Sequence, residues 1–254
     1  MEPLIVGVVG SSSSGKSTLC AALDAASNIP FAVVALDDFF VERAAAPRWD
    51  PSALPWPAGG AAPAALCPDD ADTNCPGYVD WARAEAALAA ALAAARADSA
   101  AGGACAGWRA VVVVVGFLLL SEPAAALAAR VQRWVVLTTD AAADEALWRR
   151  KWTRRKAVAS TDSEPGQQGQ RVERPSYEQC GVSAAEFRVF YEGHVRARWR
   201  EHGEGRPPPQ GAPLLEVSCM LPTADAVSDV LEFLGLEKQP SPLEQSAVRL
   251  PPMV

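Results

Sequence analysis

Residues 4–18 read L-I-V-G-V-V-G-S-S-S-S-G-K-S-T, and this stretch decides the fold. Its first six residues form an apolar run typical of a buried strand, and residues 10–18 match the phosphate-binding pattern G-x-x-x-x-G-K-[ST]. Residues 19–26 then favour a helix. Because a phosphate-binding loop joins a strand to a helix, this order predicts nucleotide binding rather than a glycine-rich turn that matches by chance.

Each residue type in the loop has a chemical role in holding the phosphates of ATP. Gly10 and Gly15 allow a backbone with positive φ, so that successive N–H groups can point at an anion in front of a helix N-terminus. Lys16 is expected to reach the β and γ phosphates, and the Ser17 hydroxyl is expected to bind Mg²⁺. The predicted ATP-binding residues of the loop are Gly10, Ser11, Ser12, Ser13, Ser14, Gly15, Lys16, Ser17 and Thr18.

Length, composition and charge narrow the class of protein. The chain has 254 residues, of which 50% are apolar, and no internal repeat, so we expect a single domain over residues 1–236. A net charge of −7 provides no basic surface for nucleic acid. The longest apolar run, residues 111–120, is too short to cross a bilayer. We therefore expect neither nucleic acid nor a membrane as a partner, and no feature of the sequence specifies an oligomeric state.

The cysteines and the first residues predict the compartment. The six cysteines form no C-x-x-C pair and the chain has two histidines, which argues against a structural zinc site and fits a reducing environment. The first predicted strand begins near residue 4, which leaves no room before it for a signal or transit peptide. We therefore expect a cytoplasmic protein.

Strand and helix patterns alternate along the chain. Several strands are continuously apolar, as required where helices cover both faces of a parallel sheet. The expected fold is therefore α/β, a three-layer, doubly wound parallel sheet. Strands are predicted at residues 4–9, 31–36, 111–115, 135–137 and 214–217, and helices at residues 81–97, 123–130, 140–156, 183–200 and 223–234.

Three segments interrupt this pattern. Residues 41–77 are rich in alanine, proline and glycine, and we expect an irregular, partly mobile insertion there. Residues 157–175 are polar and predicted to form a loop, and residues 237–254 are predicted to be a disordered tail.

Acidic and basic side chains are predicted to meet the phosphate loop at the carboxyl edge of the sheet, where ligands bind in such folds. Asp37 and Asp38 follow the second strand directly. A carboxylate there can accept the proton of an attacking hydroxyl and hold Mg²⁺, although an acidic pair can also merely cap a turn. The predicted helix at 140–156 carries a basic cluster that is either a lid over the nucleotide or a solvated face.

The motifs together resemble those of the nicotinamide riboside kinases, a branch of the uridine kinase-like nucleoside kinases. The resemblance covers roughly residues 4–236 and rests on the loop at 10–18, L-D-D-F-F at 36–40, G-F-L-L-L at 116–120, L-T-T at 137–139, R-R-K-W-T-R at 149–154 and Y-E-G-H-V at 191–195. It implies a P-loop NTPase-type kinase fold and transfer of a phosphoryl group from ATP to the 5′-hydroxyl of nicotinamide riboside, in NAD biosynthesis or salvage.

The resemblance also implies site residues. Asp37 matches the catalytic base, Lys16 a catalytic cation, and Ser17 and Asp37 match positions associated with magnesium. The nucleoside substrate would contact Asp37, Asp38, Phe39, Phe40, Tyr78, Asp80, Trp81 and Lys151, and the ATP phosphates would contact Arg150 and Arg154 as well as the loop. Asp80 can either grip a ribose diol or cap the helix that follows it.

Three positions depart from the family pattern. Val115 stands where a glutamate is usual, Lys151 stands for an arginine, and Arg155 with Lys156 replaces an aromatic residue, whose place Tyr177 would have to take. Two alternatives therefore stay open. One is a kinase of the same fold for uridine or another small metabolite, and the other is an ATP-binding protein with weak or no catalysis.

Overall fold

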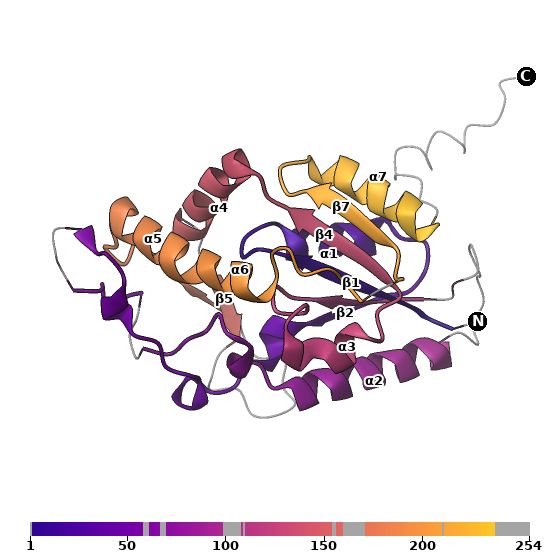
Figure 1. The fold of residues 1–254 in the computed structure, drawn as a ribbon. Helices are drawn as coiled ribbons and strands as arrows, with labels where there is room; N and C mark the ends of the chain where they lie inside the picture. Colours follow the sequence, from indigo (N-terminus) through magenta and orange to yellow (C-terminus); the bar gives the residue numbers. More distant parts are fainter. Residues whose placement is uncertain are drawn as a thin grey trace, which may run out of the picture.

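A parallel sheet forms the centre of the protein (Figure 1). The computed structural model describes residues 2–57, 61–66, 70–98, 108, 110–153, 156–159, 171–209 and 211–236. Within these ranges the main sheet has the strand order β2-β3-β1-β4-β7, with every neighbouring pair parallel. The strands are β1 (Leu4–Gly10), β2 (Phe31–Ala35), β3 (Val111–Val115), β4 (Arg133–Thr138) and β7 (Leu214–Ser218).

Helices cover both faces of this sheet, as the apolar strands predicted. Helices α1 (Lys16–Ala26) and α7 (Thr223–Leu234) lie on one face, and α2 (Trp81–Asp98) and α3 (Ala125–Ala128) lie on the other. In β3, Val111 and Val113 belong to the first core and Val112 and Val114 to the second, and each is fully buried. The fold is therefore the predicted three-layer α/β sandwich.

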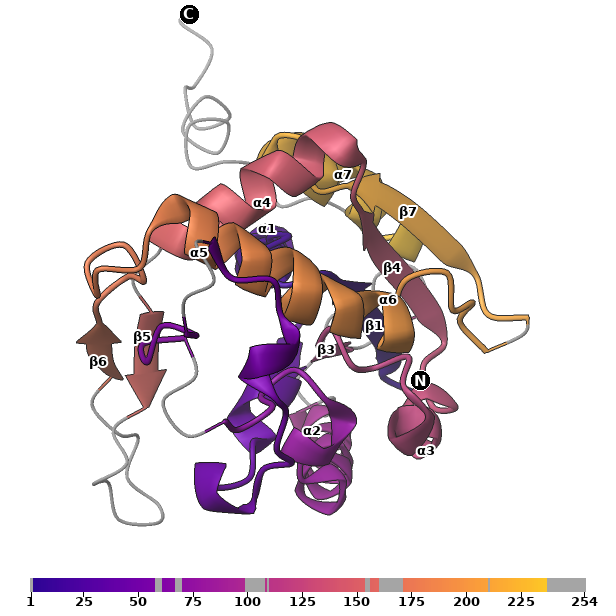
Figure 2. The same cartoon turned by 60° about the vertical axis from the view of Figure 1, so that its left-hand side comes forward.

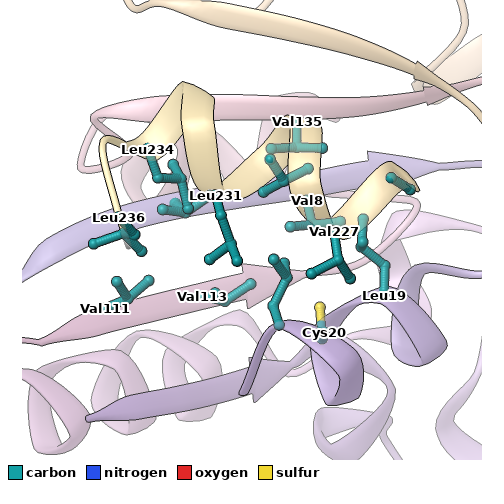
Figure 3. Packing of buried hydrophobic residues seen from close by; sticks show 14 of the residues in the cluster. Val8, Leu19, Cys20, Val111, Val113, Val135, Val227, Leu231, Leu234 and Leu236 are labelled. Carbon is teal, nitrogen blue, oxygen red and sulfur yellow. The ribbon is translucent and has the colours of Figure 1, made fainter. Parts of the chain in front are cut away.

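Alternate side chains of the strands build the core between the sheet, α1 and α7 (Figure 3). Val8 and Val113 from the sheet meet Leu19 and Cys20 from α1 and Leu231 from α7. Burial raises the pKa of the Cys20 thiol to about 12, in spite of the Lys16 charge nearby. Cys20 therefore acts as a small apolar side chain in this core.

The helices and strands between residues 141 and 202 differ from the predicted bounds. The basic helix α4 ends at Thr153 rather than Lys156 (Ala141–Thr153), and Lys156–Ala159 (β5) pairs antiparallel with Arg171–Arg174 (β6). The predicted loop at 157–175 therefore carries strands at its two ends. The predicted helix at 183–200 consists of α5 (Ala184–Phe190), the π-helical segment η7 (Tyr191–Arg196) and α6 (Ala197–His202). The predicted tail at 237–254 lies outside the described residues.

The described parts of the alanine- and proline-rich insertion are irregular but packed. They contain the short 3-10 turns η2 (Arg43–Ala45), η3 (Pro51–Ala53) and η5 (Pro76–Tyr78). Figure 2 shows the insertion running beside the α5–α6 helical stretch. Trp49, Leu54 and Trp56 pack in one cluster with residues of α4 and α5, so the insertion is attached to the lid side of the protein.

We expect Leu231→Ala to lower the free energy of unfolding by about 2–4 kcal/mol, because it empties space in the core between α7 and the sheet. Urea unfolding followed by circular dichroism measures this. The control is Leu214→Ala, whose side chain is 43% exposed on an edge strand and whose loss should cost less than about 1 kcal/mol. Equal losses in the two variants would contradict this description of the core.

Candidate active site

The phosphate-binding loop joins the carboxyl end of β1 to the first turn of α1. Gly15 is the N-cap residue of α1 and has φ 97°, a left-handed conformation that glycine adopts without strain. Ser13 also has positive φ, at 68°. The first backbone N–H groups of α1 have no intrahelical partners and point out of the helix toward the loop. The sequence motif thus has the strand–turn–helix context that anion binding requires.

Unpartnered hydroxyl groups in the loop fit a phosphate ligand. The hydroxyls of Ser11 and Ser14 are buried and have no hydrogen-bond partner among the described residues. Lys16 Nζ donates to the carbonyl oxygens of Gly10 at 3.0 Å and Ser11 at 2.8 Å, so its charge is held over the loop. Ser17 is exposed at the start of α1, where its hydroxyl is accessible to Mg²⁺. The residues present therefore fit ATP with Mg²⁺.

Helix α4 brings two basic side chains to this loop. Arg150 donates to the carbonyl oxygen of Ser13 at 3.3 Å, and Lys151 Nζ lies 2.5 Å from the Ser12 hydroxyl. Lys151 is only 7% exposed, although it is a lysine on a helix that covers the site. These contacts join α4 to the phosphate loop, where Lys151 is buried and Arg150 stays exposed to solvent.

The remaining members of the basic cluster differ in their positions. Arg149 pairs with Glu145 at 2.8 Å and lies over the Trp148 ring, so its charge is used within the helix. The predicted nucleotide contact Arg154 and its neighbour Arg155 lie outside the described residues. Tyr177, the predicted replacement for the lid aromatic, packs against Phe187 with ring centroids 4.9 Å apart.

A cavity of about 210 Å³ opens beside the phosphate loop. Thr18 of α1, Leu137 of β4 and Arg150 of α4 line it together with the loop that follows β7. Sequence reasoning missed this loop, because no motif marks it and only the strand order places it next to α1. The residues of the loop that line the cavity are Ser218, Cys219, Met220, Leu221, Pro222 and Thr223.

The predicted acceptor-side residues come together at the end of β2. Asp37 and Asp38 lie in the exposed turn η1 (Leu36–Phe39), which continues directly from β2. Phe40 pairs with Val79, and the backbone N–H of Asp80 donates to the carbonyl oxygen of Phe39 at 2.7 Å. The segments 37–41 and 78–80 therefore lie side by side at the same edge of the sheet as the phosphate loop. These two segments are called the acceptor wall below.

The three candidates for gripping a nucleoside have structural roles in this wall. Tyr78 is buried and its ring stacks on that of Phe40 at 4.6 Å. Asp80 Oδ1 accepts from the backbone N–H of Arg83 at 3.1 Å and so caps helix α2. Trp81 Nε1 donates to the carbonyl oxygen of Pro76 at 3.0 Å. The helix-capping alternative for Asp80 is thus present in the structure.

Val115 occupies the position at the end of β3 where the family pattern has a glutamate. Its side chain is 5% exposed between the paired residues Val8 of β1 and Ala35 of β2, and it offers no oxygen to a cation. Among the described residues no group of three or more His, Cys, Asp and Glu side chains could hold a metal ion. The residues that the sequence predicts for Mg²⁺ are Ser17 and Asp37, with phosphate and water expected to supply the other ligands.

Comparison with known proteins supports the fold and leaves the substrate open. No protein-family model and no curated protein sequence matches the chain. A protein described as a fructose transport system kinase from Silicibacter sp. TM1040 matches at TM-score 0.50 and 19% identity, over 85% of this chain and 90% of its own.

Two more distant solved structures are also kinases by description. A gluconokinase from Sinorhizobium meliloti 1021 matches at TM-score 0.42 and 16% identity, over 97% of this chain and 96% of its own. A shikimate kinase from Aquifex aeolicus matches at TM-score 0.33 and 14% identity, over 91% and 96%. With the phosphate loop in its strand–turn–helix setting, the chain has the α/β P-loop kinase fold. The comparisons support no specific relation to the nicotinamide riboside kinases.

We expect Arg150→Ala to weaken ATP binding about tenfold, since it removes a cation held against the phosphate loop. Isothermal titration with Mg²⁺-ATP measures the Kd. Arg149→Ala is the matched control, because the neighbouring charge is paired with Glu145 and lies over the Trp148 ring of its own helix. A Kd raised equally in both variants would mean that the whole helix acts only through its net charge.

Bound ATP should protect Cys219 from alkylation, because this thiol lines the cavity beside the phosphate loop. Burial raises its pKa, although Arg150 lowers it in part, so the reaction with iodoacetamide is best followed near pH 9 by mass spectrometry of the separated peptides. Cys180 is exposed and is not among the residues that line this cavity, so its labelling should not change with ATP. Equal labelling of Cys219 with and without ATP would place the nucleotide elsewhere.

Proposed function

We propose that this chain is an ATP-dependent kinase that transfers a phosphoryl group to a hydroxyl of a small metabolite. The observation that carries the proposal is the contact of Arg150 and Lys151 of α4 with the phosphate loop. The carboxylates after β2 follow a parallel strand of the same sheet and so lie at the same edge. A kinase of this type catalyses mainly by positioning and by charge stabilisation, and these groups supply both.

Each group has a defined part in the proposed reaction. Asp37 accepts the proton of the acceptor hydroxyl as its oxygen bonds to the γ-phosphorus. The bond from that phosphorus to the β–γ bridging oxygen breaks, and ADP leaves. Lys16, Arg150 and Lys151 stabilise the negative charge on the transferring oxygens. Mg²⁺, held by Ser17 and Asp37, would neutralise phosphate charge when bound.

The cavity beside the loop is proposed to take the base of the nucleotide. It lies at the N-terminal end of α1, and its walls combine apolar groups such as Leu137 and Leu221 with polar groups such as Thr18 and Ser218. Such a mixture suits a flat, partly apolar ring with polar edges.

For the acceptor we propose the 5′-hydroxyl of nicotinamide riboside or a closely related pyridine nucleoside. This substrate rests on the motif resemblance, above all on L-D-D-F-F at 36–40 and E-G-H-V at 192–195. The partly exposed rings of Phe39 and Phe40, beside Asp37 and Asp38, give a planar cation an aromatic and acidic surface. The protein would then be a cytoplasmic enzyme of NAD biosynthesis or salvage.

A second acceptor class is a sugar or sugar-like polyol. The solved structure at TM-score 0.50 is described as a fructose transport system kinase, and here the nucleoside candidates Tyr78 and Asp80 are engaged in packing and helix capping. A third candidate function, nucleotide binding without catalysis, is favoured by Val115 at the end of β3.

ADP release in the presence of Mg²⁺-ATP separates these candidates. The assay compares nicotinamide riboside, nicotinic acid riboside, uridine and fructose at matched concentrations with a reaction that lacks an acceptor. Release that requires a pyridine riboside supports the proposed substrate, and release with fructose alone replaces it by a sugar. If none of the tested acceptors causes ADP release and ATP still raises the Tm, the result supports nucleotide binding without catalysis.

Asp37→Asn should lower kcat at least about a hundredfold with the accepted substrate, because the amide cannot take a proton from the hydroxyl. Asp229→Asn, on the exposed face of α7, removes the same charge away from the site and should leave kcat unchanged. If Asp37→Asn keeps kcat within about tenfold of the unchanged protein, Asp37 is not the base.

A further inference from the structure

The segment E-G-H-V at 192–195 touches no part of the phosphate loop in the hydrogen bonds and ion pairs that the structure describes. It lies in η7, a π-helical turn within the helical stretch from α5 to α6. Such wide turns are rare and often mark functional sites. The wide turn places buried polar side chains on two different sides of one helix.

On one side, His194 faces the insertion between β2 and α2. Its imidazole stacks on the ring of Trp49 at 4.0 Å and lies 5.4 Å from the ring of Phe190, and these two rings are 6.0 Å from each other. His194 Nε2 lies 3.2 Å from Asp72 Oδ1, and the two side chains are 6% and 1% exposed. Gly193 beside it leaves room for Leu54, since a Cβ there would approach Leu54 Cδ2 to 2.5 Å. The motif therefore packs directly against the insertion through His194 and Gly193.

Asp72 is the buried anchor of this contact. Its Oδ2 accepts from Arg198 Nε at 2.9 Å, and its Oδ1 also accepts from the backbone N–H of Asn74 at 3.0 Å. Burial alone would raise the pKa of this carboxyl, but the hydrogen bond from His194, with the other contacts, holds the pKa below its usual range. A charged carboxylate that is this deeply buried is stable only while its partners remain in place.

Backbone hydrogen bonds connect Asp72 to the acceptor wall. The N–H of Asp72 donates to the carbonyl oxygen of Pro47 at 2.7 Å, and the chain then turns so that the N–H of Tyr78 donates to Cys75 at 3.1 Å. The carbonyl oxygen of Tyr78 accepts from Val41 at 2.9 Å. The segment fixed by Asp72 at one end thus holds residues 39–41, next to the proposed base, at the other.

On the other side of η7, Arg196 faces the lid. It is 8% exposed and pairs with Asp144 in the first turn of α4, and its NH2 lies 3.3 Å from Glu204 Oε1. Residues two apart on a helix point to different sides, so Arg196 and His194 contact different parts of the protein. Arg196 therefore serves as an internal comparison for His194, with similar burial on the same turn.

We propose that His194 and Asp72 are positioning residues for the acceptor. They contact no reacting group. Their contact holds the insertion against η7 and so sets the distance between the wall at residues 37–41 and the phosphate loop. This inference rests on the proposed kinase function, and it assigns to the acceptor side a motif that the nucleotide side does not use. Arg196, by contrast, positions α4 and hence the nucleotide side.

The test uses His194→Phe, which keeps an aromatic ring in the cluster with Trp49 and Phe190 and removes the donor to Asp72. With the substrate identified by ADP release, His194→Phe should raise the acceptor KM about tenfold and leave the ATP KM within about twofold. Arg196→Met should do the reverse. His194→Gln restores a donor to Asp72 and should bring the acceptor KM most of the way back to that of the unchanged protein. Equal changes of both KM values in both single variants would overturn the assignment.

A second measurement needs no acceptor. Hydrogen exchange, read by mass spectrometry on the purified full chain, should show faster exchange at Val41 and Asp80 in His194→Phe, because their N–H groups form the bonds within the wall. Exchange in α1 should not change. Unaltered exchange at both amides overturns the inference even if the kinase function holds. Faster exchange without phosphorylation of any acceptor retains the positioning contact and rejects the proposed function. If His194→Phe does not fold, Asp72→Asn with the same two readouts replaces it.

Discussion

The pairing of β1 between β3 and β4 is the constraint on which the rest of the structure depends. Helices cover both faces of this strand, so its side chains are buried and the chain can leave the sheet only at Gly10. Parallel neighbours end at the same edge, which brings the turn after β2 and the helix after β4 toward the phosphate loop. Unpaired N–H groups at the start of α1 then make an anion site without any charge in the core.

The two halves of the proposed site are built in different ways. The phosphate-binding part of the nucleotide half is local, because nine consecutive residues, 10–18, form the loop and its helix start. The acceptor half joins segments 37–41 and 78–80. The chain between them is held by aromatic packing and by its buried carboxylate Asp72, which pairs with His194 and Arg198 on a distant helical stretch. The position of residues 39–41 therefore depends on contacts of the insertion, whereas the phosphate loop depends on β1 and α1.

Local patterns predicted most of the fold and only part of the site. The bounds of β3 and α7 agree with the prediction, since a continuous apolar run and a clear helical face each leave a strong signal. The strands β5 and β6 gave no such signal in the sequence, because each is only four residues long. The cavity-lining loop after β7 was missed for a different reason: its residues gain their role from the strand that lies next to β7.

The sequence by itself determined the alternation of strands and helices and the phosphate loop, because both follow from short-range periodicity and backbone preferences. Only the tertiary structure decided which cations serve the loop: Arg150 and Lys151 touch it, whereas the adjacent Arg149 is paired within its own helix. It also decided that Asp80 caps α2 and that Asp72 is buried beside His194. A charged side chain takes its role from the groups packed around it. For Lys151 and Asp72 these groups include residues 139 and 126 positions away in the chain.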